Sequence, residues 1–190
     1  MARVHLVEKE QAPPEVREIF QKIEDNGAKI LNLYKTVANS PKVLLNFIRL
    51  GNSIIRQTEL PPRLREIAIL RVAKLTGSEY EWTQHAPLAL EVGVSQKQLD
   101  SILDWKNSSV FNDEEHAVLQ YTDEVTRKVK VTDQSFNALK NFFSEQAIVE
   151  LTLTIGFYGM VARLLVPLQV EIDKGIGSVK ELIGKAKSKE

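Results

Sequence analysis

The chain has 190 residues, with 25 Lys and Arg residues balanced by 25 Asp and Glu residues, and it contains no cysteine. The absence of cysteine excludes thiol nucleophiles, disulfides, and zinc or iron–sulfur sites that need thiolate ligands. The balanced charge argues against a nucleic-acid partner, because binding to a phosphate backbone needs a surplus of basic residues.

The N-terminal ten residues mix charged and apolar side chains and lack the apolar run of a secretory signal. We therefore expect a cytoplasmic protein. The most apolar stretch, residues 147–170, is interrupted by Glu150 and Arg163. A charge near the centre of a bilayer costs about 3 kcal/mol, so we expect a buried or subunit-interface helix and no membrane partner.

The periodicity of apolar residues is helical along nearly the whole chain, and no alternating pattern indicates a pair of strands. Prolines and capping residues mark the helix starts, and Gly77 ends one helix by adopting a left-handed conformation. Ser95 and Gln98 form a capping box. The expected helices span 13–25, 29–38, 41–57, 63–76, 78–92, 96–104, 113–129, 133–143 and 147–170.

These elements predict an all-α fold, a compact bundle of about eight or nine helices. We expect one domain over residues 1–173. The remaining residues, 174–190, contain several lysines and glycines and are expected to form a loosely packed tail.

The residues that could carry chemistry concentrate between Glu66 and His85. Ser78, Glu81 and His85 are spaced by three and four residues, which places them on one face of the expected helix. A carboxylate one turn before an imidazole can orient the ring and raise its pKa, so this spacing favours an acid–base pair. A solvated ion pair on the helix surface is the alternative reading.

Metal and nucleotide sites find no support in the sequence. One histidine with one carboxylate supplies too few zinc ligands, and no His-x3-His pair exists. Phosphate-binding loops, dinucleotide fingerprints and the nucleophile elbow of serine hydrolases are absent as well. We expect neither a metal nor another cofactor.

Two stretches, LREIAILRVA at 64–73 and GSEYEWTQH at 77–85, carry a family resemblance. Together with Ala89 and the Gly-Val-Ser at 93–95, they resemble the carboxymuconolactone decarboxylase and alkylhydroperoxidase-D-like family. The resemblance covers about residues 60–103, and it implies the alkylhydroperoxidase-D-like type of helical bundle.

The hydroperoxidase branch of that family has a glutamate, eleven residues, and then Cys-x-x-Cys-x3-His. Carried over by position, the glutamate is Glu66, the cysteines are Ser78 and Glu81, and the histidine is His85. Serine and glutamate cannot cycle between thiolate and disulfide, so we expect no thiol peroxidase activity.

The decarboxylase branch has Glu-Trp-x-x-His, as this chain has at Glu81, Trp82 and His85. The resemblance therefore implies cofactor-free proton transfer on a small carboxylated or lactone-like metabolite by a lyase, isomerase or hydrolase. In that reading His85 transfers the proton, Glu81 orients the His85 ring, and Glu66 is a second carboxylate across the site. The residues expected to contact substrate are Ser78, Tyr80, Trp82, Tyr158, and Arg71 or Arg163 as the carboxylate anchor.

Several alternatives stay open at this point. Trp82, Tyr80 and Tyr158 could be core residues, and both arginines could be solvated surface residues. The protein could also be a catalytically silent member that only binds a ligand or assembles. The expected helix at 147–170 carries apolar side chains on all of its faces, so a second face needs a cover. Because members of the family are commonly homo-oligomers, we expect a dimer, trimer or hexamer.

Overall fold

The computed structural model describes residues 1–174 and divides the chain into two compact units. The first contains Met1–Gly51 and the segment that begins at Pro167, and the second is Asn52–Val166. The expectation of a single domain over 1–173 stays a prediction. The expected tail at 174–190 lies almost wholly outside the described residues.

Within the described residues the secondary structure is entirely helical, which confirms the predicted fold class. The nine α-helices are α1 Pro14–Asp25, α2 Asn32–Val37, α3 Pro41–Arg56, α4 Pro62–Thr76, α5 Glu79–Glu91, α6 Gln96–Ser101, α7 Asp113–Lys128, α8 Asp133–Lys140 and α9 Glu145–Leu165. Two short 3-10 helices, η1 Lys9–Gln11 and η2 Trp105–Asn107, complete the set.

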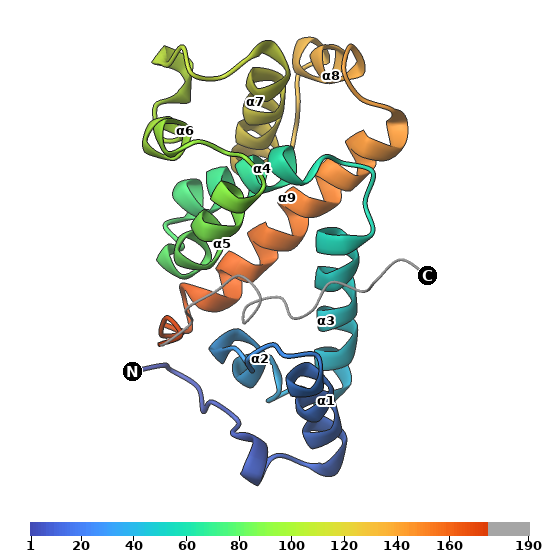
Figure 1. Cartoon of the computed structure of the whole chain (residues 1–190), viewed down its shortest axis with the longest axis vertical. Coiled ribbons are helices and arrows are strands. Elements are labelled where there is room, and N and C mark those ends of the chain that lie inside the picture. The colour runs from blue at the N-terminus through green and yellow to red at the C-terminus, as the bar shows by residue number, and fades with distance from the viewer. Residues whose placement is uncertain (175–190) are drawn as a thin grey trace. The chain divides into compact units, whose positions relative to one another are not determined.

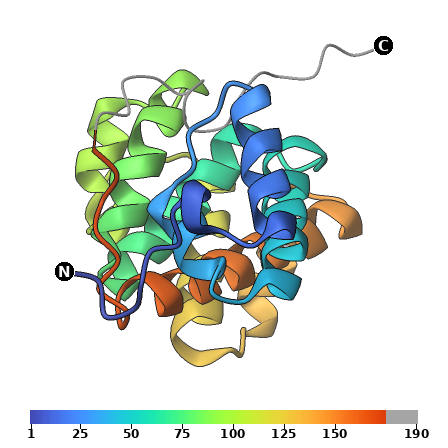
Figure 2. The same ribbon diagram turned by 90° about the horizontal axis from the view of Figure 1, so that it is seen from below.

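Hydrogen bonds join the N-terminal part of the first unit to the segment that begins at Pro167. The amide of Arg3 donates to the Leu168 carbonyl at 2.8 Å, and the amide of Asn32 donates to the Asp173 carboxylate at 2.8 Å. Figure 2 shows the blue N-terminal segment beside the red segment that follows α9. The N-terminal arm is therefore an ordered part of this unit.

Helix α4 is the centre of the second unit and contacts α5, α7 and α9 (Figure 1). All ten residues from Leu64 to Ala73 are buried. A helix buried on every side shows no amphipathic stripe, and three of these ten residues are charged: Arg65, Glu66 and Arg71. Their charges therefore need partners inside the fold.

The turn from α4 to α5 has the geometry predicted from the sequence. Gly77 adopts a left-handed φ of 69°, and its N–H donates to the Ala73 carbonyl. Ser78 then caps α5 by accepting from the backbone N–H of Glu81. This turn brings α5 back along α4, which allows side chains of the two helices to meet.

Helix α9 has the length and composition of a membrane-spanning helix, and 56% of its most apolar window is buried within the structure. Such burial is typical of the core helix of a globular protein, as the sequence predicted. The exposed apolar side chains of α9 include Val149, Leu153 and Met160, which are 57%, 51% and 42% exposed. Homo-oligomer formation stays a prediction.

Candidate acid–base site

The side chains of Glu66 and His85 meet between α4 and α5. His85 Nδ1 lies 2.8 Å from Glu66 Oε2, and both residues are buried. Because a carboxylate accepts hydrogen bonds, this contact holds the proton on Nδ1 and leaves Nε2 as the basic nitrogen. The two residues thus meet from adjacent helices, and their facing one substrate cavity stays a prediction.

Two further groups fix this pair. Tyr158 of α9 packs edge-on against the His85 ring, with the centroids 4.8 Å apart and the planes at 88°. Arg65 contacts the other carboxylate oxygen of Glu66, Oε1, at 3.2 Å and is itself only 5% exposed. The histidine is therefore held by a carboxylate on one side and by an aromatic ring on another.

Glu81 has a different role from the predicted one. It lies one turn before His85, but the partner of Nδ1 is Glu66, so the interpretation of Glu81 as the orienting residue is wrong. The spacing placed Glu81 and His85 on one helix face, but it could not show that α4 supplies a nearer carboxylate. Neither carboxylate oxygen of Glu81 has a hydrogen-bond partner among the described residues.

Burial dominates the chemistry of Glu81, which is only 2% exposed. Removal from water raises the pKa of this carboxyl from 4.5 to about 8, and the nearby Ser78 hydroxyl offsets only part of the rise. The Ser78 hydroxyl acts by its proximity, because its oxygen accepts from the Glu81 backbone amide and does not hydrogen-bond to the carboxylate. Glu81 is therefore mainly a neutral carboxylic acid at pH 7.

The remaining motif residues at the start of α5 are Ser78, Tyr80 and Trp82, and each has a different environment. The Ser78 oxygen accepts a long hydrogen bond of 3.5 Å from the Glu81 amide, so the first cysteine position of the resembled motif holds a helix cap. Tyr80 is buried. Trp82 is half-buried, and the ammonium of Lys74 lies 3.8 Å from the centroid of its ring. Contacts with substrate stay a prediction for all three residues.

Neither predicted arginine joins the Glu66–His85 pair. Arg71 is buried and forms two hydrogen bonds with Asp123, at 2.6 and 2.9 Å, and it also donates to two backbone carbonyls. Its guanidinium is thus fully engaged, which corrects both the substrate-anchor and the surface interpretations. Arg163 is exposed and donates to the Gly159 carbonyl at 2.7 Å, in agreement with the surface alternative.

Sequence reasoning missed Arg65 and Asp123, the charged partners of Glu66 and Arg71. Arg65 could have been found, because a charged residue next to Glu66 in an otherwise apolar helix needs a buried partner. Asp123 lies 52 positions after Arg71, and no local pattern connects the two. Among residues 1–174, no group of three or more His, Asp or Glu side chains is arranged to hold a metal ion.

Comparison with known proteins places this site in a family context. Residues 41–124 match the model of the carboxymuconolactone decarboxylase family. A curated relative, the uncharacterized protein YnjA of Escherichia coli K12, is 28% identical over 109 residues, which are 57% of this chain and 60% of that protein.

Solved structures share the fold. The AhpD core of a peroxidase-related protein from Ralstonia eutropha JMP134 is 15% identical, and the match covers 91% of this chain and 93% of that one with a TM-score of 0.78. A protein of unknown function from Agrobacterium tumefaciens is 23% identical over 73% and 96% of the two chains, with a TM-score of 0.68. The debrominase Bmp8 is 19% identical over 85% and 87%, with a TM-score of 0.71. The resemblance seen in the sequence is thus confirmed: residues 41–124 match the model of the carboxymuconolactone decarboxylase family, and the chain shares its fold with the AhpD-like structures.

Proposed function

We propose that the protein is a cofactor-free acid–base enzyme that acts on a small carboxylated or lactone-like metabolite. The observation that carries the proposal is the His85–Glu66 hydrogen bond of 2.8 Å, which leaves Nε2 of His85 available as a base. A positioned base in a water-poor site is the main requirement for taking a proton from carbon next to a carbonyl group.

Glu81 supplies the complementary acid. With a pKa of about 8 it retains its proton at neutral pH, whereas Glu66 shares its carboxylate with Arg65 and His85. Two carboxyl groups in such different environments are typical of an acid and a base with separate roles. Glu81 and His85 are also one turn apart on α5, a spacing that places them on the same helix face.

These groups suit a decarboxylation or an isomerisation. In a decarboxylation His85 takes the proton of the substrate's carboxyl group, carbon dioxide leaves, the electrons of the broken carbon–carbon bond stay on the substrate, and the carbon that receives them takes a proton from Glu81. In an isomerisation His85 removes a proton from one carbon and a proton is returned at another. Both reactions need proton transfer only, which agrees with a chain that has no cysteine.

The similarity to debrominase Bmp8 does not favour the same chemistry here. One solved structure is that of a cysteine-to-alanine variant of Bmp8 in complex with 2,3,4-tribromopyrrole. That complex supports the idea that this fold can hold a small ring compound. Because the present chain has no cysteine, proton transfer by His85 is the chemistry that its own residues support.

The test is to incubate the protein with 4-carboxymuconolactone and related lactone acids in D2O. NMR spectroscopy would follow loss of the carboxyl group and incorporation of deuterium at carbon. His85→Gln should abolish both signals, and Glu66→Gln should reduce them by roughly a hundredfold, because general base catalysis contributes about that much or more. Glu79→Gln removes an exposed carboxylate from the same helix and should leave them unchanged.

Two outcomes would contradict the proposal. If His85→Gln retained the wild-type rate on a compound that is converted, His85 would not be the base. If the protein bound some of the lactone acids but neither converted any of them nor incorporated deuterium into them, the catalytically silent alternative would be favoured.

A further inference from the structure

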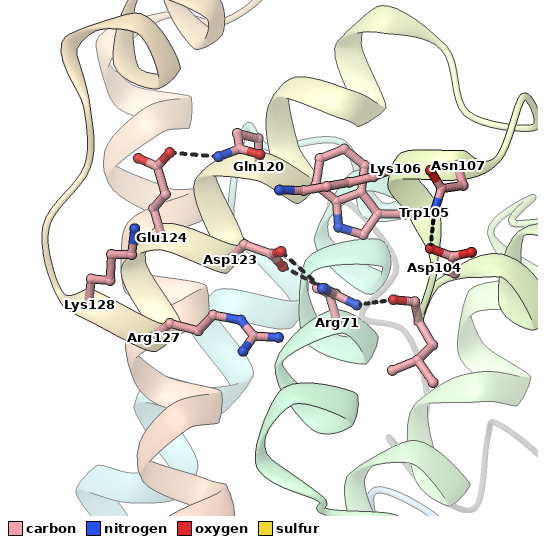
Figure 3. A pocket seen from close by; sticks show the side chains of 11 residues that line it. Arg71, Asp104, Trp105, Lys106, Asn107, Gln120, Asp123, Glu124, Arg127 and Lys128 are labelled. Atoms are coloured by element: carbon pink, nitrogen blue, oxygen red, sulfur yellow. Dashed lines mark hydrogen bonds and ion pairs between the residues drawn. The ribbon is translucent and has the colours of Figure 1, made fainter.

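A hollow lies in the second unit, between α7, η2 and Arg71 of α4 (Figure 3). Its volume is about 450 Å³, within the range of sites that hold small metabolites. It contains no member of the Glu66–His85 cluster or of the α5 motif. The charged and aromatic side chains of its lining include Arg71, Trp105, Lys106, Asp123, Arg127 and Lys128.

Trp105 presents an unsatisfied donor to this hollow. The residue is only 4% exposed, and its indole Nε1 has no hydrogen-bond partner in the described part of the chain. Figure 3 shows the nitrogen on the edge of the ring that is turned towards Asp123 and Arg71. Buried indole N–H groups normally find an acceptor, so an oxygen atom of a ligand would complete the site.

The charges around the hollow leave cations available. Arg71 and Asp123 neutralise each other. Glu124 is occupied by hydrogen bonds from Gln120, Thr132 and Ser135.

Asp104 accepts a hydrogen bond from Asn107. Arg127 and Lys128 are exposed at the end of α7, and no ion pair engages either of them among residues 1–174. Lys106 lies over the Trp105 ring, with its ammonium 5.3 Å from the centroid. Three cations thus face the hollow without an ion pair among the described side chains, and together with Arg71, Asp104, Asp123 and Glu124 they give its lining a net charge of +1.

We propose that this hollow binds a small oxyanion, the phosphate or carboxylate group of a metabolite. An oxygen of the ligand accepts from Nε1 of Trp105, and its negative charge lies between Arg127, Lys128 and Lys106. Basic residues in the last turn of a helix also favour the helix dipole. The helix dipole would explain why Arg127 and Lys128 stand at the end of α7. It does not explain why the buried N–H of Trp105 has no acceptor within the described structure.

Tryptophan fluorescence tests the proposal. The chain has two tryptophans, so Trp82→Phe leaves Trp105 as the only reporter. This variant would be titrated with inorganic phosphate and, separately, with citrate, at constant ionic strength maintained with potassium chloride. We expect a saturable change in Trp105 emission, and the probe that binds more tightly distinguishes a phosphate ligand from a carboxylate ligand.

Charge variants provide the control. Arg127→Gln with Lys128→Gln should weaken binding by roughly tenfold or more, because charge-assisted hydrogen bonds are lost. Lys140→Gln removes an exposed charge from α8, outside the hollow, and should bind like the parent. All four positions altered here are half-buried or exposed, so the variants are expected to fold, and circular dichroism would verify this.

Calorimetry on Trp105→Phe, which retains a ring but lacks the N–H, should show binding weakened to a similar extent. The proposal is overturned if neither probe gives a saturable signal, if the signal follows ionic strength alone, or if the double variant binds like the Lys140→Gln control.

Discussion

Replacement of Glu81 by glutamine tests the central electrostatic feature of the acid–base site. Glutamine has the shape of a protonated glutamate and cannot ionise, so it mimics the neutral form that burial favours. At pH 5, where the native carboxyl is also neutral, we expect the two proteins to have similar free energies of unfolding. As the pH rises, only the wild type has a carboxyl at position 81 that ionises in the unfolded chain while it stays protonated in the folded one. The free energy of unfolding of the wild type therefore falls relative to that of the variant.

The sign and size of the effect follow from the pKa of Glu81. In the unfolded chain the carboxyl loses its proton near its ordinary value of 4.5, whereas in the folded chain it retains the proton to about pH 8. Between these values the folded state binds more protons, so the contribution of Glu81 to stability falls as the pH rises. At about 1.4 kcal/mol per pH unit, the wild type should lose roughly 3 to 4 kcal/mol relative to Glu81→Gln between pH 5 and pH 8.

Urea unfolding followed by circular dichroism at several pH values would measure this difference. Subtracting the free energy of unfolding of the variant from that of the wild type at each pH removes the contribution of the titratable groups that both proteins share. Glu79→Gln, which removes an exposed carboxylate two residues away, should show less than about 1 kcal/mol of such change. A flat difference for Glu81→Gln from pH 5 to pH 9 would refute the reasoning, since it would mean that the carboxyl ionises freely in the folded protein.

Three further predictions follow from other parts of the structure. Asp123→Ala should lower the free energy of unfolding by about 3 to 5 kcal/mol, because it leaves the Arg71 guanidinium buried without its carboxylate; a loss below about 1 kcal/mol in urea unfolding would show that water reaches the pair. Gly77→Ala should cost about 1 kcal/mol from the left-handed backbone alone, since no atom lies within 4 Å of the added methyl group; a thermal melt that matches the wild type would contradict this. Light scattering at micromolar concentration should give a mass above 21.5 kDa, because the exposed apolar side chains of α9 need a cover; a persistent monomer would show that they tolerate water.

The sequence predicted the helices best where a cap defines their ends. The capping box of Ser95 and Gln98 and the left-handed Gly77 are both present as expected. Helix α9 was placed less accurately, at 147–170 instead of Glu145–Leu165. Its true start uses the cap at Ser144, which the prediction overlooked. Its last residue, Leu165, comes shortly before Pro167, which has no backbone N–H to continue the helix.

The candidate site was predictable only in part. Spacing alone placed Glu81 and His85 on one face, and the family resemblance added Glu66. Which carboxylate touches the imidazole depends on how α4 and α5 pack across the Gly77 turn, and a single-helix pattern does not contain that information. The same limit hid the pairing of Arg71 with Asp123, because the two residues lie on different helices far apart in the chain.

The burial of the central ten residues of α4, Leu64–Ala73, has a consequence for how a substrate could enter. A helix without a solvent face cannot open by local fraying, so its backbone amides between Leu64 and Ala73 should be among the last in the chain to exchange with deuterium. We therefore expect Glu66 to be anchored to the most slowly opening element of its unit. Access to the His85 side of the pair would then come from motion of α5 or α9 and not from α4.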